Sequence, residues 1–213
     1  MTEQLTAAQT KSETTSSTQE LLINGRTVAG QETVLTEGSL CLLKALCKQF
    51  APEVPELLAR RKHKQKHIDL GELPDFLEQT RAIRQGHWQI RGIPADLQDR
   101  RVEITGPVER KLVINALNAN AKVFMADFED SLAPSWEKVV QGQINLRDAV
   151  NGDISYTAAE TGKHYSLNED PAVLICRVRG LHMQEKHVQF AGSAIPAALF
   201  DFCIYFYNNY RAL

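Results

Sequence analysis

The feature that most constrains the fold of this chain is the alternation of strand-like and helix-like segments in its second half. Runs of apolar and β-branched residues occupy positions 102–105, 122–127 and 172–178, and a segment with helical spacing follows each of them, in the last case after a loop. Parallel neighbouring strands need such a crossover connection. The pattern therefore predicts three βα units of a parallel sheet in an α/β protein.

Turn residues mark the ends of these segments. Gly106 and Pro107 end the first strand, and Pro134 begins the second helical segment. The first helix carries an apolar stripe that we expect to pack on the sheet, made of Val108, Leu112, Ala116 and Leu117. Runs at 154–157 and 164–167, with a turn around Gly162 between them, predict a hairpin before the third strand. An aromatic helix is expected from about residue 195 onward.

The first half of the chain has a different character. Residues 1–20 are rich in Thr, Ser and Gln and read as a disordered tail. Helices are then expected after an N-cap at Thr36, from near Pro52, and over 74–83, with one apolar face of the first formed by Leu40, Leu43, Leu46 and Phe50. We expect residues 21–87 to form an N-terminal helical clasp domain and residues 88–213 to form the first part of a barrel.

Charge and cysteine spacing exclude several classes of protein. Lys and Arg total 24 against 26 Asp and Glu, so no overall field favours nucleic acid or an acidic membrane surface. The second helix contains the basic run RRKHKQKH, which we interpret as a solvated face rather than a phosphate or nucleic-acid site. The four cysteines of the chain lack C-x-x-C spacing, which predicts reduced thiols without a cysteine zinc site. No apolar stretch is long enough to span a bilayer, and we expect a cytoplasmic protein.

Charged residues gather where two of the predicted strands end. The stretch KVFMADFEDS, residues 122–131, passes from an apolar run to Asp127, Glu129 and Asp130. The stretch AVLICRVRG, residues 172–180, ends on Arg177 and Arg179, which share a face because side chains alternate along a strand. Ligands of α/β proteins bind at the carboxyl ends of the strands. If the two strands are parallel neighbours, an acidic and a basic cluster meet at one rim.

A purely structural interpretation stands beside this functional one. Asp130 or Ser131 could cap the turn or helix that follows the second strand. Glu129 and Arg177 could form a structural ion pair, and Arg179 could be satisfied by an acidic side chain or a backbone carbonyl. His182 is interpreted as a loop residue rather than a base. The joint presence of both clusters is what favours a site.

Three long stretches closely resemble the malate synthase family in its shorter form: IPADLQDRRVEITGPVERKLVINALNANAKVFMADFEDSLAPSW, GQINLRDAVNG and PAVLICRVRGLHMQEKHV. The resemblance runs from about Leu73 to the last residue, and before that only LPDF and the helical character match. It implies an N-terminal helical clasp, a (β/α)8 barrel and a C-terminal plug. It also implies condensation of glyoxylate with acetyl-CoA and water to malate and CoA, in the glyoxylate cycle, with Mg²⁺.

The resemblance also implies roles for individual residues. Arg177 corresponds to the catalytic arginine that holds glyoxylate and steadies negative charge on the enolate, with Arg179 as the alternative if the register differs by two. Glu129 and Asp130 correspond to residues beside Mg²⁺ that hold its waters rather than bind it directly. The family's direct Mg²⁺ ligands, its aspartate base and its CoA-binding surface lie farther along and are not expected in this chain.

The chain departs from the family in length. A barrel of this class needs about 250 residues, whereas about 110 follow Val102. We therefore expect an N-terminal fragment that is inactive by itself, with a complementing C-terminal chain as a candidate partner. Two alternatives stay open: another Mg²⁺-dependent enolate enzyme of the citrate-lyase-like barrel class, and a non-catalytic truncated interaction protein.

Overall fold

The computed structural model of the protein describes residues 20–213. Its central sheet has three parallel strands in the order β2-β3-β6, and all three were expected from the sequence. Their bounds are β2 Glu103–Gly106, β3 Val123–Asp127 and β6 Val173–Arg177. The register sets Asp127 opposite Arg177 at the carboxyl end of the sheet. The expected disordered tail over 1–20 lies, except for Glu20, outside the described residues.

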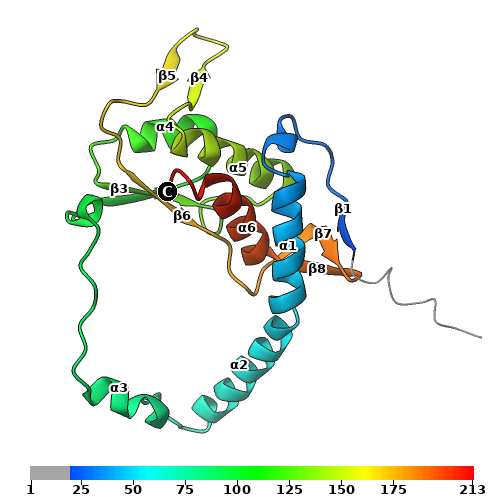
Figure 1. Ribbon diagram of the computed structural model, residues 1–213, viewed down its shortest axis with the longest axis vertical. Helices are drawn as coiled ribbons and strands as arrows, with labels where there is room; N and C mark the ends of the chain where they lie inside the picture. The colour runs from blue at the N-terminus through cyan, green and yellow to red at the C-terminus, as the bar shows by residue number, and fades with distance from the viewer. Residues whose placement is uncertain (1–19) are drawn as a thin grey trace, which may run out of the picture.

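Helices α4 Arg110–Leu117 and α5 Trp136–Val150 follow the first two of these strands (Figure 1). The side chain of Ser135 caps α5 by accepting a hydrogen bond from the backbone N–H of Lys138. The predicted hairpin is confirmed, with β4 Ser155–Thr157 antiparallel to β5 His164–Ser166. The chain thus repeats strand and helix around a partial barrel sheet, as the alternation predicted.

The predicted apolar stripe of α4 is wrong at one position. Leu112 is 42% exposed, whereas α4 buries Val113, Ile114 and Leu117. Glu109 still has extended backbone, so α4 begins at Arg110. A helix opened by Pro107, as the sequence predicted, would have begun earlier. A helical face depends on where the first turn begins, and a shift of one residue rotates every later side chain by about 100°.

A second sheet was not expected from the sequence. It is antiparallel, in the order β1-β7-β8, with β1 Leu21–Ile23, β7 Gln184–Phe190 and β8 Ser193–Pro196. We predicted helical structure for the first of these segments, a loop for the second, and for the third a loop that passes into a helix at about residue 195, whereas α6 spans Ala197–Asn209. Left-handed backbone at Ala191 (φ 50°) and Gly192 (φ 79°) forms the tight turn between β7 and β8. The three residues of β1 are extended because they pair with β7, a long-range contact that local propensity does not report.

Helix α1 Glu37–Phe50 packs against α6 Ala197–Asn209. The predicted N-cap is confirmed, because the side chain of Thr36 accepts a hydrogen bond from the N–H of Ser39 at 3.2 Å. Contact between the helices is close: a Cβ on Gly38 would lie 1.8 Å from the Tyr207 hydroxyl. Residues 21–50 therefore share a core with β7 and α6, and the domain division at residue 87 stays a prediction.

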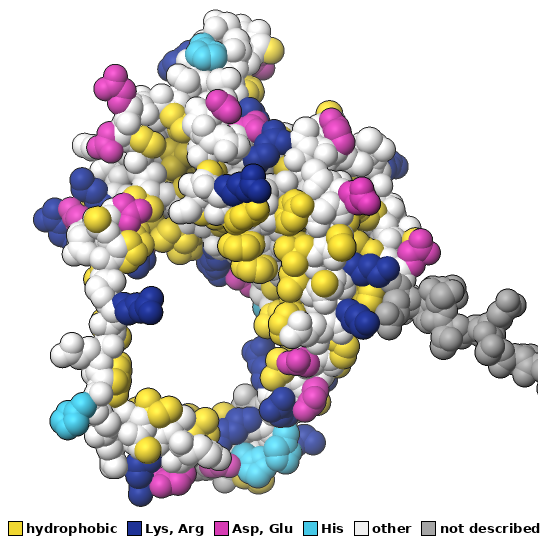
Figure 2. All heavy atoms as spheres, in the orientation of Figure 1, with side chains coloured by type: hydrophobic (Ala, Val, Ile, Leu, Met, Phe, Trp, Pro, Cys, Tyr) yellow, Lys and Arg dark blue, Asp and Glu magenta, His cyan; other side chains and the backbone are white. Residues whose placement is uncertain are grey.

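Residues 53–102, called the arm below, extend away from this core. They contain α2 Glu53–Asp69, the 3₁₀ turn Glu78–Thr80, α3 Arg81–Gln85 and the 3₁₀ turn Ala95–Leu97, none with a buried residue. The second predicted helix is thus confirmed, and the third is shorter and later than expected. Figure 2 shows an opening between the arm and the rest of the molecule. Large apolar side chains of the arm are exposed, including Leu70, Leu73, Phe76, Trp88 and Ile90.

Among residues 20–213, none of the helices combines the length and apolar character needed to cross a membrane.

Gly142 of α5 tests the packing of this helix on the sheet. A Cβ there would lie 2.3 Å from Cγ2 of Val108 and 2.9 Å from Cε1 of Phe128. We expect Gly142→Ala to lower the free energy of unfolding by about 1–3 kcal/mol through overpacking, although alanine is the better helix former. Urea denaturation measures the difference. Gly92→Ala, where a Cβ meets nothing within 4 Å, should stay within about 0.5 kcal/mol, and equal effects of the two would contradict this packing.

Candidate functional site

Four charged residues meet where β3 and β6 end, and we call them the rim cluster: Asp127, Glu129, Asp130 and Arg177. Nη2 of Arg177 lies 3.0 Å from Oε2 of Glu129 and also donates to Oδ2 of Asp130. Its Nη1 lies 3.5 Å from Oδ2 of Asp127. The Arg177 side chain is 37% exposed. The acidic and basic strand ends therefore meet at one rim, as a parallel pairing of the two strands implies.

Asp127 organises the acidic side of the rim cluster. It is fully buried, and its Oδ1 accepts hydrogen bonds from the backbone N–H groups of Glu129 and Asp130 at 2.8 and 3.2 Å. Its Oδ2 accepts from the Ser131 hydroxyl at 3.1 Å. The carboxylate that caps this turn is thus Asp127, rather than Asp130 or Ser131, which the sequence suggested for that role. The capped turn holds Glu129 and Asp130 at the rim, facing Arg177.

Gly180 is a residue of this site that the sequence reasoning missed. A Cβ there would lie 2.8 Å from Oε1 of Glu129 and 2.6 Å from ring atoms of His182. Glycine therefore lets the chain leaving β6 pass directly beside the Glu129 carboxylate. The signal in the sequence was a glycine immediately after the charged end of a strand, a position where close backbone approach is common.

Arg179 lies only two residues from Arg177 but belongs to a different cluster. It is 2% exposed, and its guanidinium makes a forked contact with Asp201 of α6 at 2.8 and 2.7 Å. Its Nη1 lies 2.9 Å from Oε2 of Glu185 of β7. Burial alone would lower the pKa of Arg179, but hydrogen bonds to Asp201 and the charges of both carboxylates raise it, so the side chain stays charged. We call Arg179, Asp201 and Glu185 the core ion cluster. Acidic side chains thus satisfy Arg179, as the structural interpretation of the sequence anticipated.

The sequence contained a signal for the core ion cluster. Asp201 is a lone acid in the apolar helix FDFCIYFY, and it is fully buried. A buried carboxylate requires a cationic partner. Burial first, and then the charges of Asp201 and Asp127, raise the pKa of the Cys176 thiol, which favours the less reactive protonated form.

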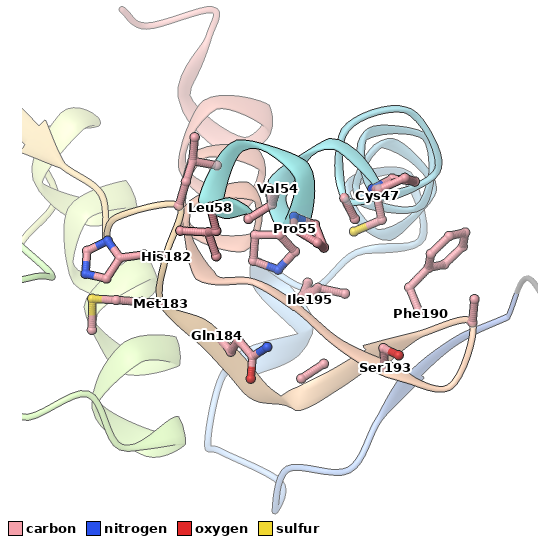
Figure 3. A pocket seen from close by; sticks show the side chains of 16 residues that line it. Cys47, Val54, Pro55, Leu58, His182, Met183, Gln184, Phe190, Ser193 and Ile195 are labelled. Carbon is pink, nitrogen blue, oxygen red and sulfur yellow. The ribbon is translucent and has the colours of Figure 1, made fainter. Parts of the chain in front are cut away.

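A cavity of about 470 Å³ lies beside the segment that follows β6 (Figure 3). Its walls come from the end of α1, the start of α2 and the β7–β8 hairpin, and they are mostly apolar, as Leu58, Met183 and Ile195 illustrate. His182, which is exposed, stands at one end of it. None of the rim cluster residues lines this cavity, so it is separate from the charged site.

The carboxylates of the rim cluster have the chemistry that a hard cation prefers. Glu129 and Asp130 have side chains that are 21% and 68% exposed and offer oxygen atoms. Three carboxylates against one guanidinium leave an excess of negative charge at the rim. Within residues 20–213, no group of three or more His, Cys, Asp and Glu side chains is arranged to hold a metal ion directly. The arrangement suits contact with a hydrated cation through its waters.

The two arginines should respond differently to removal of charge. Arg179→Met leaves Asp201 and Glu185 buried without a cation, which costs about 3–5 kcal/mol of unfolding free energy. Arg177→Met removes a partly exposed arginine whose ion pairs are screened by solvent, so it should cost clearly less than Arg179→Met. Chemical denaturation of the two variants and the wild type measures both effects. Equal losses would show that Arg177 is as structural as Arg179.

Comparison with known proteins gives the family. Residues 19–82 match the model of the malate synthase N-terminal domain, and residues 173–213 match that of the malate synthase TIM barrel domain. Malate synthase A of Escherichia coli is 64% identical over 183 residues, which cover 86% of this chain and 34% of that protein. Malate synthase of Myxococcus xanthus is 53% identical, covering 84% and 33%.

A plant protein gives the same result. Glyoxysomal malate synthase of Ricinus communis is 44% identical over 191 residues, which cover 89% of this chain and 34% of that protein. The chain thus spans about a third of the length of the relatives named here. Both family models and all three relatives agree. The chain belongs to the malate synthase family, and its residues correspond to the N-terminal part of that family's members.

Proposed function

We propose that this chain contributes the glyoxylate-binding arginine of a malate synthase, the enzyme that condenses glyoxylate with acetyl-CoA and water to give malate and CoA. The observation that carries the proposal is the position of Arg177, at the carboxyl end of β6 and held by carboxylates of the neighbouring parallel strand. That end of a barrel strand is where catalytic residues lie in TIM-barrel enzymes. Membership of the malate synthase family supports the assignment of the reaction.

Arg177 has the properties that this role requires. Its hydrogen bonds to Asp130 and then to Glu129 raise the pKa of the guanidinium, so it keeps its proton and acts as a donor rather than a base. A planar guanidinium can donate two hydrogen bonds to the oxygens of an α-oxo acid. The same fixed donor would stabilise the negative charge that develops on the acetyl oxygen as the enolate forms. Because Asp130 and Glu129 already orient it, little reorganisation is needed when substrate arrives.

Glu129 and Asp130 are proposed to hold waters of Mg²⁺. Their carboxylate oxygens suit a small hard cation that keeps part of its hydration shell. A bound Mg²⁺ would polarise the carbonyl group of glyoxylate. The residues of the chain have the remaining proposed roles. Asp127 fixes the turn, Gly180 leaves room for Glu129, and Arg177 would bind and orient the substrate.

We also propose that residues 1–213 alone do not catalyse the reaction. Catalysis would require the strands that complete the barrel. The described residues contribute three parallel strands, whereas a barrel of this class has eight. We propose acetyl-CoA as the second substrate, beside glyoxylate. We also propose a complementing C-terminal segment as the partner of this chain. A cytoplasmic location stays a prediction as well.

A chimera tests the proposal directly. Residues 1–213 would replace the matching part of Escherichia coli malate synthase A, and free thiol release from acetyl-CoA would be followed with glyoxylate and Mg²⁺. We expect the chimera to be active and Arg177→Lys to lower kcat/KM by about 10²–10³-fold, as loss of a well-placed transition-state donor does. Arg84→Lys, on the exposed helix α3, is the matched control and should leave the rate unchanged. The polypeptide 1–213 alone should release no thiol above the enzyme-free control.

Two results would contradict these expectations. Turnover by the polypeptide alone would show that the described site is sufficient. An Arg177→Lys chimera as active as its parent would remove Arg177 from the reaction, whatever the family.

The acidic residues are tested through the metal requirement. In the same chimera, Glu129→Gln and Asp130→Asn should each raise the Mg²⁺ concentration for half-maximal activity by about 10–100-fold, because residues that hold the ion's waters tune its affinity. Glu137→Gln, an exposed acid in the first turn of α5, serves as the control. An unchanged Mg²⁺ dependence in both rim variants would separate the carboxylates from the ion.

A further inference from the structure

Two histidines stand one helical turn apart near the end of α2. The Nε2 atoms of His63 and His67 lie 3.0 Å from each other, and their ring centroids are 4.5 Å apart. Both side chains are exposed, and no residue of α2 is buried. The pair therefore faces solvent and takes no part in the core. Histidines at i and i+4 on one helix face are a recurrent arrangement for binding a single metal ion.

The end of the helix orients one of these rings. Gly71 is left-handed at φ 93°, and the N–H groups of Gly71 and Glu72 bond back to the carbonyls of Ile68 and His67 at 2.9 and 3.0 Å. This turn folds Glu72 back against the helix. Its Oε2 lies 2.9 Å from Nδ1 of His67, while its Oε1 pairs with Lys64. A carboxylate that accepts from Nδ1–H leaves the Nε2 lone pair of a neutral imidazole free to bind a metal.

We propose that His63 and His67 form a two-histidine binding site for a borderline divalent transition metal ion, Ni²⁺ or Cu²⁺, with water completing the coordination. Metal–imidazole bonds are about 2.0–2.1 Å long, so nitrogens 3.0 Å apart subtend roughly a right angle at one ion. Right angles suit the tetragonal geometry of Cu²⁺ and Ni²⁺. Zn²⁺, which prefers a tetrahedral site, is expected to bind more weakly here. On binding, His63 moves its proton from Nε2 to Nδ1 through solvent, because the lone pair is needed at Nε2.

Charges around the pair act in both directions. The carboxyl end of a helix carries partial negative charge, which favours a cation there. Glu72 adds a negative charge beside His67 and neutralises Lys64. The remaining lysines of the basic run oppose a cation, so the affinity should be modest. Mg²⁺ prefers oxygen ligands and should not compete; this site on α2 is independent of the rim cluster and of the proposed activity.

Calorimetric titration of the 213-residue protein with Ni²⁺, in the presence of a non-chelating reductant, tests the proposal. We expect one site, at least a tenfold weaker affinity in His63→Gln and in His67→Gln, and about a tenfold loss in Glu72→Gln. His164→Gln is the matched control, since that exposed imidazole contacts Thr157 instead of a second histidine. Far-UV circular dichroism checks that every variant keeps its helices.

A second measurement identifies the ligating atoms. Diamagnetic Zn²⁺ should shift the ¹⁵N resonances of Nε2 in His63 and His67 together and leave those of His164 in place. Ni²⁺ affinity within twofold of the wild type in both His63→Gln and His67→Gln would overturn the proposal. An affinity lost equally in His164→Gln, or full displacement of Ni²⁺ by equimolar Mg²⁺, would overturn it as well.

Discussion

The parallel register between β3 and β6 is the constraint on which the candidate site depends. It sets Asp127 opposite Arg177 and carries the backbone of both strands into the same rim. The pairing continues one step further, because the N–H of Phe128 donates to the carbonyl of Arg177 at 3.0 Å. Asp127 then closes a turn on the backbone of Glu129 and Asp130. A shift of one residue would turn every side chain of β6 to the opposite face of the sheet.

Burial decides the roles of the two neighbouring arginines. Arg177 is the last residue of β6 and Arg179 lies two residues beyond it, yet the first is 37% exposed at the rim and the second is 2% exposed among Asp201 and Glu185. A buried guanidinium with a complete set of carboxylate partners has little left to offer a ligand. Arg177, with part of its surface open to solvent, keeps donor capacity for a small anion. The fork between Arg179 and Asp201 also ties β6 to α6, which steadies the strand end that carries Arg177.

Prediction from sequence succeeded where the signal was local and failed where it was long-range. The three strands of the parallel sheet, the N-cap at Thr36 and the β4–β5 hairpin follow from periodicity and turn residues, and all were found. The sheet made of β1, β7 and β8 was missed, since β1 has three residues and pairs with a strand far along the chain. Gly180 was missed for a related reason: the sequence shows a glycine after a charged strand end, but it does not show that the Glu129 carboxylate lies beside that glycine.

By itself, the sequence determined the order of strands and helices, the acidic and basic ends of two strands, and the family, because these depend on residue type and spacing along the chain. Only the tertiary structure decided which arginine is available, which acid caps the turn and how α1 shares a core with α6. The physical reason is that exposure and ion pairing depend on which elements pack against each residue. Arg177 and Arg179 cannot be distinguished by residue type or by sequence context. They differ because β7 and α6 pack around Arg179 and pair it with Glu185 and Asp201.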